Sequence, residues 1–270
     1  MNNIIGQDKL TNEVDRIFRI FKGSECKIRP HFILTGASGT GKSHSIKMLC
    51  VKNSIHMIEI NAAQLTKEGT SGNSLSKALS PIGQQGGKPV VCFVDEFDKL
   101  FISGNSNDSC AHESTTGVQN EFLKVLEADT ANVFGDYGKY VPISISNVLF
   151  VFAGAFNGEE DITLDRLREI GLKTEFLGRV GLVYNTKSLT LDDLFTILDN
   201  SELLDNYVSL VKNSDKEKSI YEIKAYLQSN FENNTLGARQ INTLIHQYFI
   251  KGSLTEDNTK SITFKEKLEL

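Results

Sequence analysis

The 270-residue chain lacks several features that would place it in a specialised class. Its four cysteines, Cys26, Cys50, Cys92 and Cys110, lie far apart and form no Cys-x-x-Cys pair. This argues against a zinc site or a disulfide framework and fits a reducing cytosol. No uncharged apolar run approaches the roughly 18 residues that a membrane span needs, and the amino terminus lacks the basic-then-apolar pattern of a signal peptide. We therefore expect a cytoplasmic protein with no contact to a membrane.

Neither sign of charge is in large excess. The 29 lysines and arginines nearly balance the 34 aspartates and glutamates, so the formal net charge is −5. A mildly acidic chain is not a bulk-electrostatic binder of nucleic acid, although a local basic patch could still exist. Apolar residues make up 40% and charged residues 23% of the chain, which is the range of globular proteins and excludes disorder.

Short apolar runs alternate with helical patterns through the first two thirds of the chain. Runs rich in β-branched and aromatic residues predict strands that are buried on both faces. These strands are 32–34, 90–94 and 148–152, with weaker candidates at 55–60 and 181–184. Apolar residues at helical spacing predict helices over 10–21 and 118–126. Strands alternating with helices favour an α/β fold with a doubly wound parallel sheet.

The pattern changes after about Thr186. From Leu189 onward the apolar spacing is helical almost throughout, which predicts an α/β core over 1–186 followed by a small all-helical domain over 187–270. A short strand is expected near 261–264. The polar stretch 103–115 is rich in Asn, Ser, Asp and Gly and predicts a flexible loop.

One segment has the spacing of a phosphate-binding loop. It is Gly36-Ala37-Ser38-Gly39-Thr40-Gly41-Lys42-Ser43, which fits G-x-x-x-x-G-K-[ST] between a predicted strand and a helical stretch. Glycines let consecutive backbone N–H groups point at one anion, and the helix N-terminus adds partial positive charge. Lys42 is predicted to reach the β- and γ-phosphates, and the Ser43 hydroxyl to take a Mg²⁺ position.

A second segment supplies the acids that such a site needs. The apolar strand at 90–94 is followed by Asp95 and Glu96. Asp95, at the carboxyl end of the strand, is predicted to hold Mg²⁺ directly or through water, and Glu96 to orient and polarise the attacking water. A kinase or a G protein would not need the second acid there, so the pair favours ATP hydrolysis. The expected cofactors are ATP and Mg²⁺.

The acidic strand end, Asp95-Glu96-Phe97-Asp98-Lys99-Leu100, resembles that of the AAA+ ATPases, in the branch of the ClpX and HslU protein unfoldases. The resemblance covers residues 4 to about 245 and therefore nearly the whole chain. Four further segments match in order: Ile4-Ile5-Gly6-Gln7, the stretch 117–127, Glu175-Phe176-Leu177-Gly178-Arg179 and Leu236-Gly237-Ala238-Arg239.

The resemblance implies roles for these segments. Ile4, Ile5 and Gly6 would contact adenine, and His44, which follows Ser43, is counted with the nucleotide-binding residues. Arg179 would be an arginine finger that stabilises transition-state charge on the nucleotide of a neighbouring subunit. Arg239 would sense the γ-phosphate within its own subunit. A forked, permanently charged guanidinium suits phosphate oxygens. A finger that acts in trans implies a ring, which the resemblance makes hexameric.

Four departures from the family bear on what the protein acts on. The first pore loop carries Thr70-Ser71 where ClpX has an aromatic-aliphatic pair, so little apolar area is available to grip a polypeptide. The stretch 157–161 leads within a few residues into 164–168, which leaves no room for the peptidase-docking loop. We expect neither a zinc-binding domain before Ile4 nor an inserted domain like that of HslU. No polar side chain directly follows the strand at 148–152, so Asn157 is a weak sensor 1 candidate.

Three functions are consistent with these residues. The first is a ring ATPase that remodels a specific protein or protein assembly without an attached peptidase. The second is a DNA-directed ATPase, such as a helicase loader, a transposition regulator or a phage replication or packaging accessory. In it Lys67 and His112 near the pore loops would contact DNA. The third is a nucleotide-gated scaffold, which intact Lys42 and Glu96 disfavour. The composition suggests the cytoplasm of a bacterium, or of its host if a phage encodes the chain.

Overall fold

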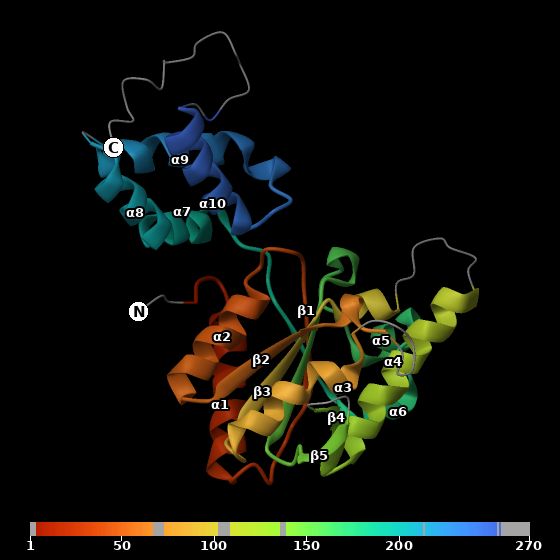
Figure 1. The fold of residues 1–270 in the computed structure, drawn as a ribbon. Coiled ribbons are helices and arrows are strands. Elements are labelled where there is room, and N and C mark those ends of the chain that lie inside the picture. Colours follow the sequence, from red (N-terminus) through yellow and green to blue (C-terminus); the bar gives the residue numbers. More distant parts are fainter. Residues whose placement is uncertain are drawn as a thin grey trace. The chain divides into compact units, whose positions relative to one another are not determined.

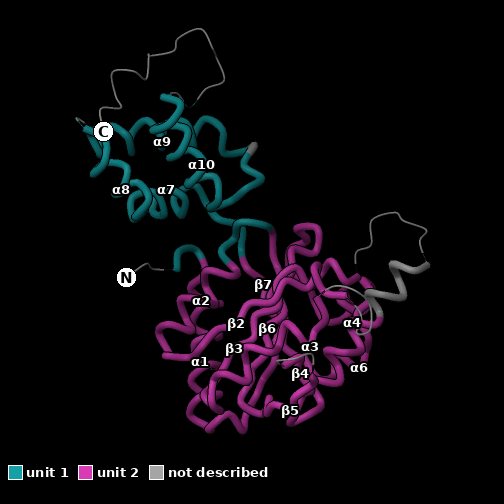
Figure 2. Tube along the Cα trace, viewed as in Figure 1, with its two compact units in different colours: residues 1–6, 38–41, 187–270 teal, residues 7–37, 42–186 magenta. Residues whose placement is uncertain are grey.

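The computed structural model describes residues 4–66, 73–101, 109–135, 139–212, 214–252 and 254, with the backbone alone for 109–116 (Figure 1). The chain divides into two compact units (Figure 2). The α/β unit consists of Gln7–Ala37 and Lys42–Thr186. The helical unit consists of Met1–Gly6, Ser38–Gly41 and Lys187–Leu270. A four-residue piece of the phosphate-binding loop therefore groups with the helical unit, although both flanking segments belong to the other unit.

The α/β unit is built on a five-stranded parallel sheet. Its strands, in spatial order, are β2 (His56–Asn61), β3 (Val90–Asp95), β6 (Val148–Gly154), β1 (Phe32–Thr35) and β7 (Leu182–Asn185). These are the five predicted strands, so the predicted α/β fold class is confirmed. The side chains of β1, β6 and all of β3 except Asp95 are buried because helices cover both faces of the sheet.

Helices pack on the two faces of this sheet. Figure 1 shows α1 (Asp8–Gly23) and α2 (Lys42–Asn53) on one side and α3 (Leu75–Ala78), α4 (Ser109–Glu127), α5 (Leu164–Ile170) and α6 (Thr174–Arg179) on the other. The second side holds a continuous apolar core in which alternate residues of the strands meet Phe122 of α4, Leu167 of α5 and Phe176 of α6. Helix α1 buries a single stripe that includes Val14, Phe18 and Phe21.

Two parts of the α/β unit differ from the sequence-based expectation. The polar stretch 103–115 was predicted to be a loop, but α4 begins at Ser109, so that prediction is wrong for 109–115. An antiparallel pair, β4 (Thr130–Phe134) and β5 (Tyr140–Ser144), was not predicted. Val133 is the only buried side chain of this pair. Strands that bury so little need no alternation of apolar and polar residues, and the sequence therefore carries no signal for them. The strand expected near 261–264 lies outside the described residues.

The helical unit is built from α7 (Leu191–Asp199), α8 (Glu202–Leu210), α9 (Lys216–Asn230) and α10 (Arg239–His246), which continues into a π-helical turn at Gln247–Lys251. Three of these helices are preceded by an N-cap residue whose side chain accepts hydrogen bonds from backbone N–H groups of the first turn: Thr190, Ser201 and Asp215. Leucines, isoleucines and Phe249 from all four helices form the core of this unit.

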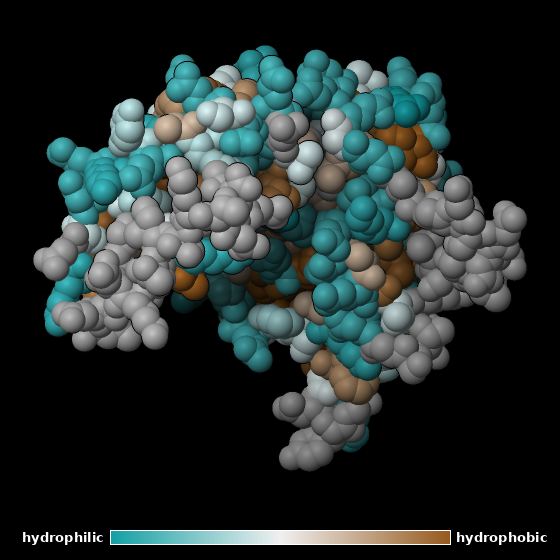
Figure 3. Space-filling view, turned by 90° about the horizontal axis from the view of Figure 1, so that it is seen from above, coloured by the Kyte–Doolittle hydropathy of each residue, from teal (hydrophilic) through white to brown (hydrophobic). Residues whose placement is uncertain are grey.

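The exposed surface is mixed in character. Figure 3 shows a mainly hydrophilic face on which hydrophobic residues lie in small, separate patches. The exposed large hydrophobic side chains are spread over many elements and include Val51, Tyr140, Leu210 and Tyr221. None of the helices in the described ranges is long and apolar enough to span a bilayer.

His31 is a buried histidine at the start of the sheet. The residue is 7% exposed, its Nδ1 accepts a hydrogen bond from the backbone N–H of Phe150 (3.0 Å), and its ring meets the Phe150 ring edge-on. Burial, with a smaller effect from the charge of Arg29, lowers the pKa of His31 to about 4. A protonated ring would lose its acceptor and place a charge in the core, so the folded state requires neutral His31.

This pKa predicts acid sensitivity. Between pH 6.5 and 4 the unfolded chain binds the proton and the folded chain does not, so stability falls as pH falls through this window. We expect His31 to account for a loss of roughly 2 kcal/mol of unfolding free energy between pH 7.5 and pH 5. Urea unfolding of wild type and His31→Gln at both pH values measures it. The variant should lose less stability than wild type, and equal losses in the two proteins would contradict the assignment.

Candidate functional site

The phosphate-binding loop has a backbone that requires glycine. Gly36, Gly39 and Gly41 have φ values of 134°, 78° and 93°, in the region that side-chain-bearing residues rarely adopt. At Gly36 space is also lacking, because a Cβ there would lie 1.9 Å from Oγ1 of Thr186. Thr186 donates to the carbonyl of Thr35 from both its backbone N–H (2.9 Å) and its hydroxyl (3.1 Å). Thr186, the residue after β7, therefore fixes the end of β1 at Thr35, where the chain enters the phosphate-binding loop.

Lys42 begins α2, directly after the loop. Its ammonium donates to the backbone carbonyls of Gly36 and Ala37, the latter at 2.9 Å. The cation is thus held on the loop's own carbonyl groups, at the end of the loop where β1 enters. A phosphate bound in the loop would offer it oxygens of higher negative charge.

Ser43 and Asp95 come together although 52 positions separate them in the sequence. The Ser43 hydroxyl donates to Oδ2 of Asp95 at 3.3 Å, which joins the first turn of α2 to the end of β3. The other oxygen of Asp95 accepts from the backbone N–H of Glu96 at 2.9 Å. A hydroxyl and a carboxylate at this position are ligands that suit Mg²⁺, which takes one or two protein oxygens and completes its shell with phosphate and water. The described ranges contain no group of three or more His, Cys, Asp or Glu residues that could hold a metal ion.

Glu96 follows β3 in a left-handed conformation with φ of 54° and ψ of 30°. Its side chain is exposed, while Phe97 next to it is fully buried. The carbonyl of Glu96 accepts from Lys99 N–H at 3.0 Å, which closes the 3₁₀ turn η3 (Phe97–Leu100). The left-handed residue thus reverses the chain at the strand end, so that the glutamate stays in solvent and the phenylalanine enters the core.

The end of β6 lies beside the loop. β6 is hydrogen-bonded to β1 on one side and to β3 on the other, so its carboxyl end lies between the loop and the two acids. It continues into the turn η5 (Phe156–Gly158), in which a Cβ on Gly158 would lie 4.0 Å from Cβ of Ala37. Asn157, the residue with the weak sensor 1 prediction, is exposed in this turn.

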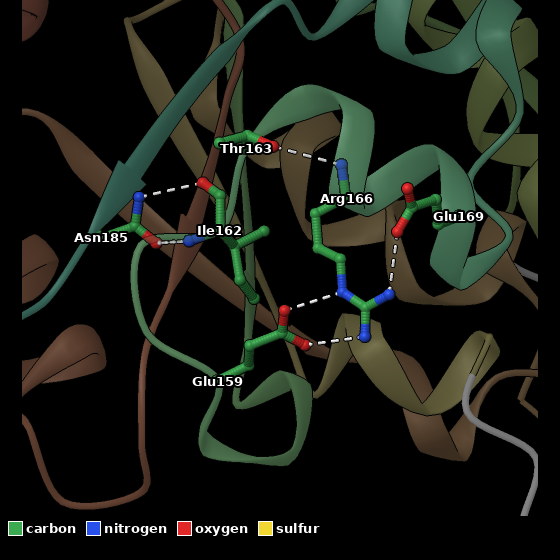
Figure 4. Close-up of polar contacts among 6 residues, drawn as sticks. All are labelled: Glu159, Ile162, Thr163, Arg166, Glu169 and Asn185. Carbon is green, nitrogen blue, oxygen red and sulfur yellow. Dashed lines mark hydrogen bonds and ion pairs between the residues drawn. The ribbon is translucent and has the colours of Figure 1, made fainter.

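The segment that follows this turn is held by two sets of polar contacts (Figure 4). Asn185, at the end of β7, accepts from the backbone N–H of Ile162 (2.8 Å) and donates to its carbonyl (3.1 Å). The same amide oxygen accepts from the Thr35 hydroxyl. Arg166 on α5 makes a forked pair with Glu159 (2.7 and 3.0 Å) and a further bond with Glu169 (2.9 Å). The path from β6 to α5 is therefore short and fixed at both ends.

The helical unit contains a second group of predicted site residues. Within this unit, the carbonyl of Gly39 accepts from Ala238 N–H at 3.0 Å, and Nη1 of Arg239 donates to the Ser38 hydroxyl at 3.1 Å. The backbones approach so closely that a Cβ on Gly39 would lie 2.0 Å from the Leu236 carbonyl oxygen. Arg239, predicted to sense the γ-phosphate, thus begins α10 in contact with a loop residue.

The other predicted nucleotide-binding residues lie in several places. Ile4, Ile5 and Gly6 are half-buried in the helical unit, where a Cβ on Gly6 would lie 2.9 Å from both Asp193 and Leu189. Thr40 is buried in the loop, and His44 is exposed in the first turn of α2. The pore-loop residues Lys67 to Gly72 lie outside the described residues, as does the side chain of His112.

Arg179 does not contact the phosphate-binding loop or the acids at the end of β3. It is the last residue of α6, and its Nε (3.2 Å) and Nη2 (3.0 Å) both donate to Oε1 of Glu127 at the end of α4. Its side chain is 55% exposed. Sequence reasoning assigned no role to this partner, nor to Thr186, Asn185 or Asp98, because no motif marks a contact between distant segments.

The arrangement suits phosphoryl chemistry. The three cysteines whose side chains the structure describes, Cys26, Cys50 and Cys92, are buried free thiols. Burial raises the pKa of Cys50 to about 12 and also raises that of Cys92, so neither is a thiolate at neutral pH. What the site offers is a glycine-rich anion cradle, a lysine, a hydroxyl–carboxylate pair and an exposed glutamate.

Comparisons with known proteins identify a family of ATPases and several relatives. Residues 32–168 match the family model described as "ATPase family associated with various cellular activities (AAA)". The ATP-dependent Clp protease ATP-binding subunit ClpX of Bacteroides fragilis is 23% identical over 300 positions, which cover 90% of this chain and 71% of that protein. The ATP-dependent protease ATPase subunit HslU of Rickettsia akari is 29% identical over 187 positions, which cover 66% of this chain and 39% of that protein. The ClpX of Bacteroides thetaiotaomicron is 28% identical, with 61% and 45% covered. The resemblance to the ClpX and HslU branch is therefore confirmed.

The close contact at Gly36 predicts that its hydrogen cannot be replaced. Gly36→Ala would place a methyl group against the Thr186 hydroxyl in a left-handed backbone, which we expect to cost about 2 kcal/mol and to lower Tm by about 4–8 °C. Gly23→Ala is the matched control, because no atom lies within 4 Å of that Cβ and the residue is helical. We expect the control to melt at or above the wild-type temperature. Equal melting of Gly36→Ala and wild type would contradict the contact.

Proposed function

The chain belongs to the AAA family of ATPases, and we propose that it hydrolyses ATP with Mg²⁺ as a ring and thereby remodels a specific protein or protein assembly. The observation that carries the nucleotide part is the Ser43–Asp95 contact at the end of a complete phosphate-binding loop. The loop N–H groups and Lys42 would bind the β- and γ-phosphates. Ser43 and Asp95 would hold Mg²⁺, which neutralises phosphate charge when bound.

In this proposal Glu96 is the catalytic base. Its exposed carboxylate follows directly on Asp95, so it can orient a water molecule and accept its proton while Asp95 stays with the metal. Ile4, Ile5, Gly6 and His44 would border the base and sugar of the nucleotide. Residues 187–270 would act as a lid domain in which Arg239 exchanges the Ser38 hydroxyl for the γ-phosphate.

A ring is proposed because Arg179 does not contact the nucleotide-binding residues of its own chain. Its contacts are with Glu127, and more than half of its side chain faces solvent at the end of a short helix. An arginine in this position can serve a neighbouring subunit's nucleotide, where it would stabilise charge in the transition state. The relatives are named as an ATP-binding subunit and an ATPase subunit, and we propose a hexamer by likeness to them.

The work of the ring is proposed to be limited remodelling without an attached peptidase. Residues 159–163 alone connect η5 to α5, and both ends of this segment are fixed, so no docking loop projects there. The first pore loop offers Thr70 and Ser71 in place of large apolar side chains. The buried free thiols are compatible with the reducing cytoplasm in which we place the protein.

Two substitutions separate nucleotide binding from hydrolysis. Lys42→Ala should abolish nucleotide binding, because the phosphates lose their nearest cation. Glu96→Gln should bind ATP like wild type and lose turnover by about 10²-fold or more, since the phosphate and metal contacts remain while the base is gone. Equilibrium binding of a fluorescent ATP analogue and phosphate release measure the two properties. Turnover of Glu96→Gln near the wild-type rate would show that another residue is the base.

Glu96→Gln also tests the substrate half of the proposal. With hydrolysis blocked, the ring should stay closed on its substrate, so affinity purification in ATP should retain protein that Lys42→Ala does not retain. Retention of DNA in its place, with ATPase activity of the wild type stimulated by DNA, would replace remodelling of protein by the DNA-directed alternative.

Arg179 is predicted to act across a subunit interface. Arg179→Ala should leave ATP affinity nearly intact and lower turnover on the order of 10³-fold. Mixing it with Lys42→Ala should restore activity, because the first variant supplies an intact pocket and the second an intact finger. Glu175→Ala, which removes an exposed charge from the same helix, is the control. Absence of recovery in rings shown to be mixed would mean that Arg179 does not act in trans.

A further inference from the structure

Asp98 is a buried carboxylate to which the proposed chemistry assigns no role. The residue is 1% exposed, and its Oδ2 accepts a hydrogen bond from the backbone N–H of Phe156 at 3.1 Å. Its Oδ1 has no hydrogen-bond partner in the described part of the chain. Nζ of Lys99 lies 3.9 Å from Oδ2 of Asp98, at the limit of an ion pair. Burying a carboxylate oxygen without a hydrogen-bond partner lowers the stability of the fold, so a role for Asp98 other than stability needs to be considered.

The hydrogen bond holds a strained turn. Phe156 and Asn157 have φ values of 45° and 58°, so two consecutive residues with side chains are left-handed. Each such residue costs on the order of 1–3 kcal/mol and persists only where its surroundings enforce it. Gly158 N–H bonds to the Ala155 carbonyl at 2.7 Å, which closes the turn on itself. Asp98 supplies the hydrogen bond that ties this turn to another element.

The fold makes room for this bond at Gly154. A Cβ on Gly154, the last residue of β6, would lie 2.8 Å from Oδ1 and 2.9 Å from Cβ of Asp98. The φ of Gly154 is not in the left-handed region, so the position needs glycine for space and not for its backbone conformation. The carboxylate therefore lies directly against the end of β6.

Asp98 lies in the turn η3, which Glu96 directly precedes. The turn η3 starts one residue after Glu96, and its Phe97 ring packs against Phe152 of β6 (4.6 Å between centroids) and stacks on Phe176 of α6 (5.2 Å). The position of Asp98 relative to the backbone of Glu96 is thus set by a tightly packed ring. Through Asp98, the element that bears the proposed base is linked to the turn at residues 156–158.

The turn at residues 156–158 also lies near the phosphate-binding loop, because a Cβ on Gly158 would lie 4.0 Å from Cβ of Ala37. From these contacts we infer that Asp98 is a positioning residue for ATP hydrolysis: it fixes the turn that carries Asn157 relative to Glu96, at the edge of the loop. This inference rests on the proposed function. Because the link orders two parts of the site and touches no nucleotide, it acts on kcat and not on ATP affinity.

The test compares two substitutions of the same residue. Asp98→Ala removes the acceptor, and we expect kcat to fall about 10- to 100-fold with the Kd for ATP within about 2-fold of wild type. Asp98→Asn keeps an amide oxygen for the Phe156 N–H and removes the charge, and we expect kcat within about 3-fold of wild type. An equal loss in both variants would show that the charge of Asp98 is required, which would overturn a positioning role through this hydrogen bond.

A double-mutant cycle shows whether Asp98 works through the turn. Asn157→Ala alone should lower kcat, and Asp98→Ala should then add less than about 2-fold to that loss. Independent, multiplicative losses would overturn the inference. The wild type and Glu96→Gln in the same assay separate it from the proposed function, because a wild type that does not hydrolyse ATP removes that function whatever Asp98 does.

A second variant covers the case in which Asp98→Ala does not fold. Gly154→Ala keeps the carboxylate but places a methyl group 2.8 Å from both Oδ1 of Asp98 and the ring of Phe156, the two residues that the hydrogen bond joins. It should therefore lower kcat by about 10-fold at unchanged ATP affinity. Gly23→Ala serves as the control for a glycine substitution without contacts. If Gly154→Ala folds and turns over ATP like wild type, the contact between Asp98 and the end of β6 has no part in catalysis.

Discussion

The packing of one ring, Phe97, constrains most of the α/β unit around the site. The ring is fully buried, and it contacts Phe152 of β6, Phe122 of α4 and Phe176 of α6. Because it follows Glu96 directly, the geometry of this cluster sets where the strand end places the proposed base. The same cluster orients the two helices that end in Glu127 and Arg179, so Glu96 and Arg179 share a single rigid support.

The order of strands explains why the site forms where it does. β6 lies between β1 and β3, so three carboxyl ends meet at one edge: the phosphate-binding loop, the turn at residues 156–158 and the acidic pair. Backbone conformations that are unfavourable elsewhere gather at this edge, at Gly36, Glu96 and Asn157. Contacts to which no role was assigned from the sequence, such as those of Thr186 and Asp98, enforce them.

Much of the fold could be predicted, because it depends on local patterns. Apolar runs gave all five strands of the main sheet, and helical spacing gave the helices of the second half. The pair β4–β5 was missed because it buries almost nothing, and α4 begins within a polar stretch that no apolar stripe marks. In that helix the later turns, around Phe122, pack into the core, and helix formation extends backward from them.

The sequence by itself determined the chemistry: a phosphate-binding loop, the acids Asp95 and Glu96, and the family resemblance rest on short, contiguous motifs whose spacing has a physical reason. Only the tertiary structure decided how these parts are held. The bond of Asp98 to the Phe156 N–H, the contact of Thr186 with Gly36 and the ion pair of Arg179 each join segments more than 50 positions apart. Such contacts follow from strand order and side-chain packing, which place distant residues side by side, and no local periodicity encodes them.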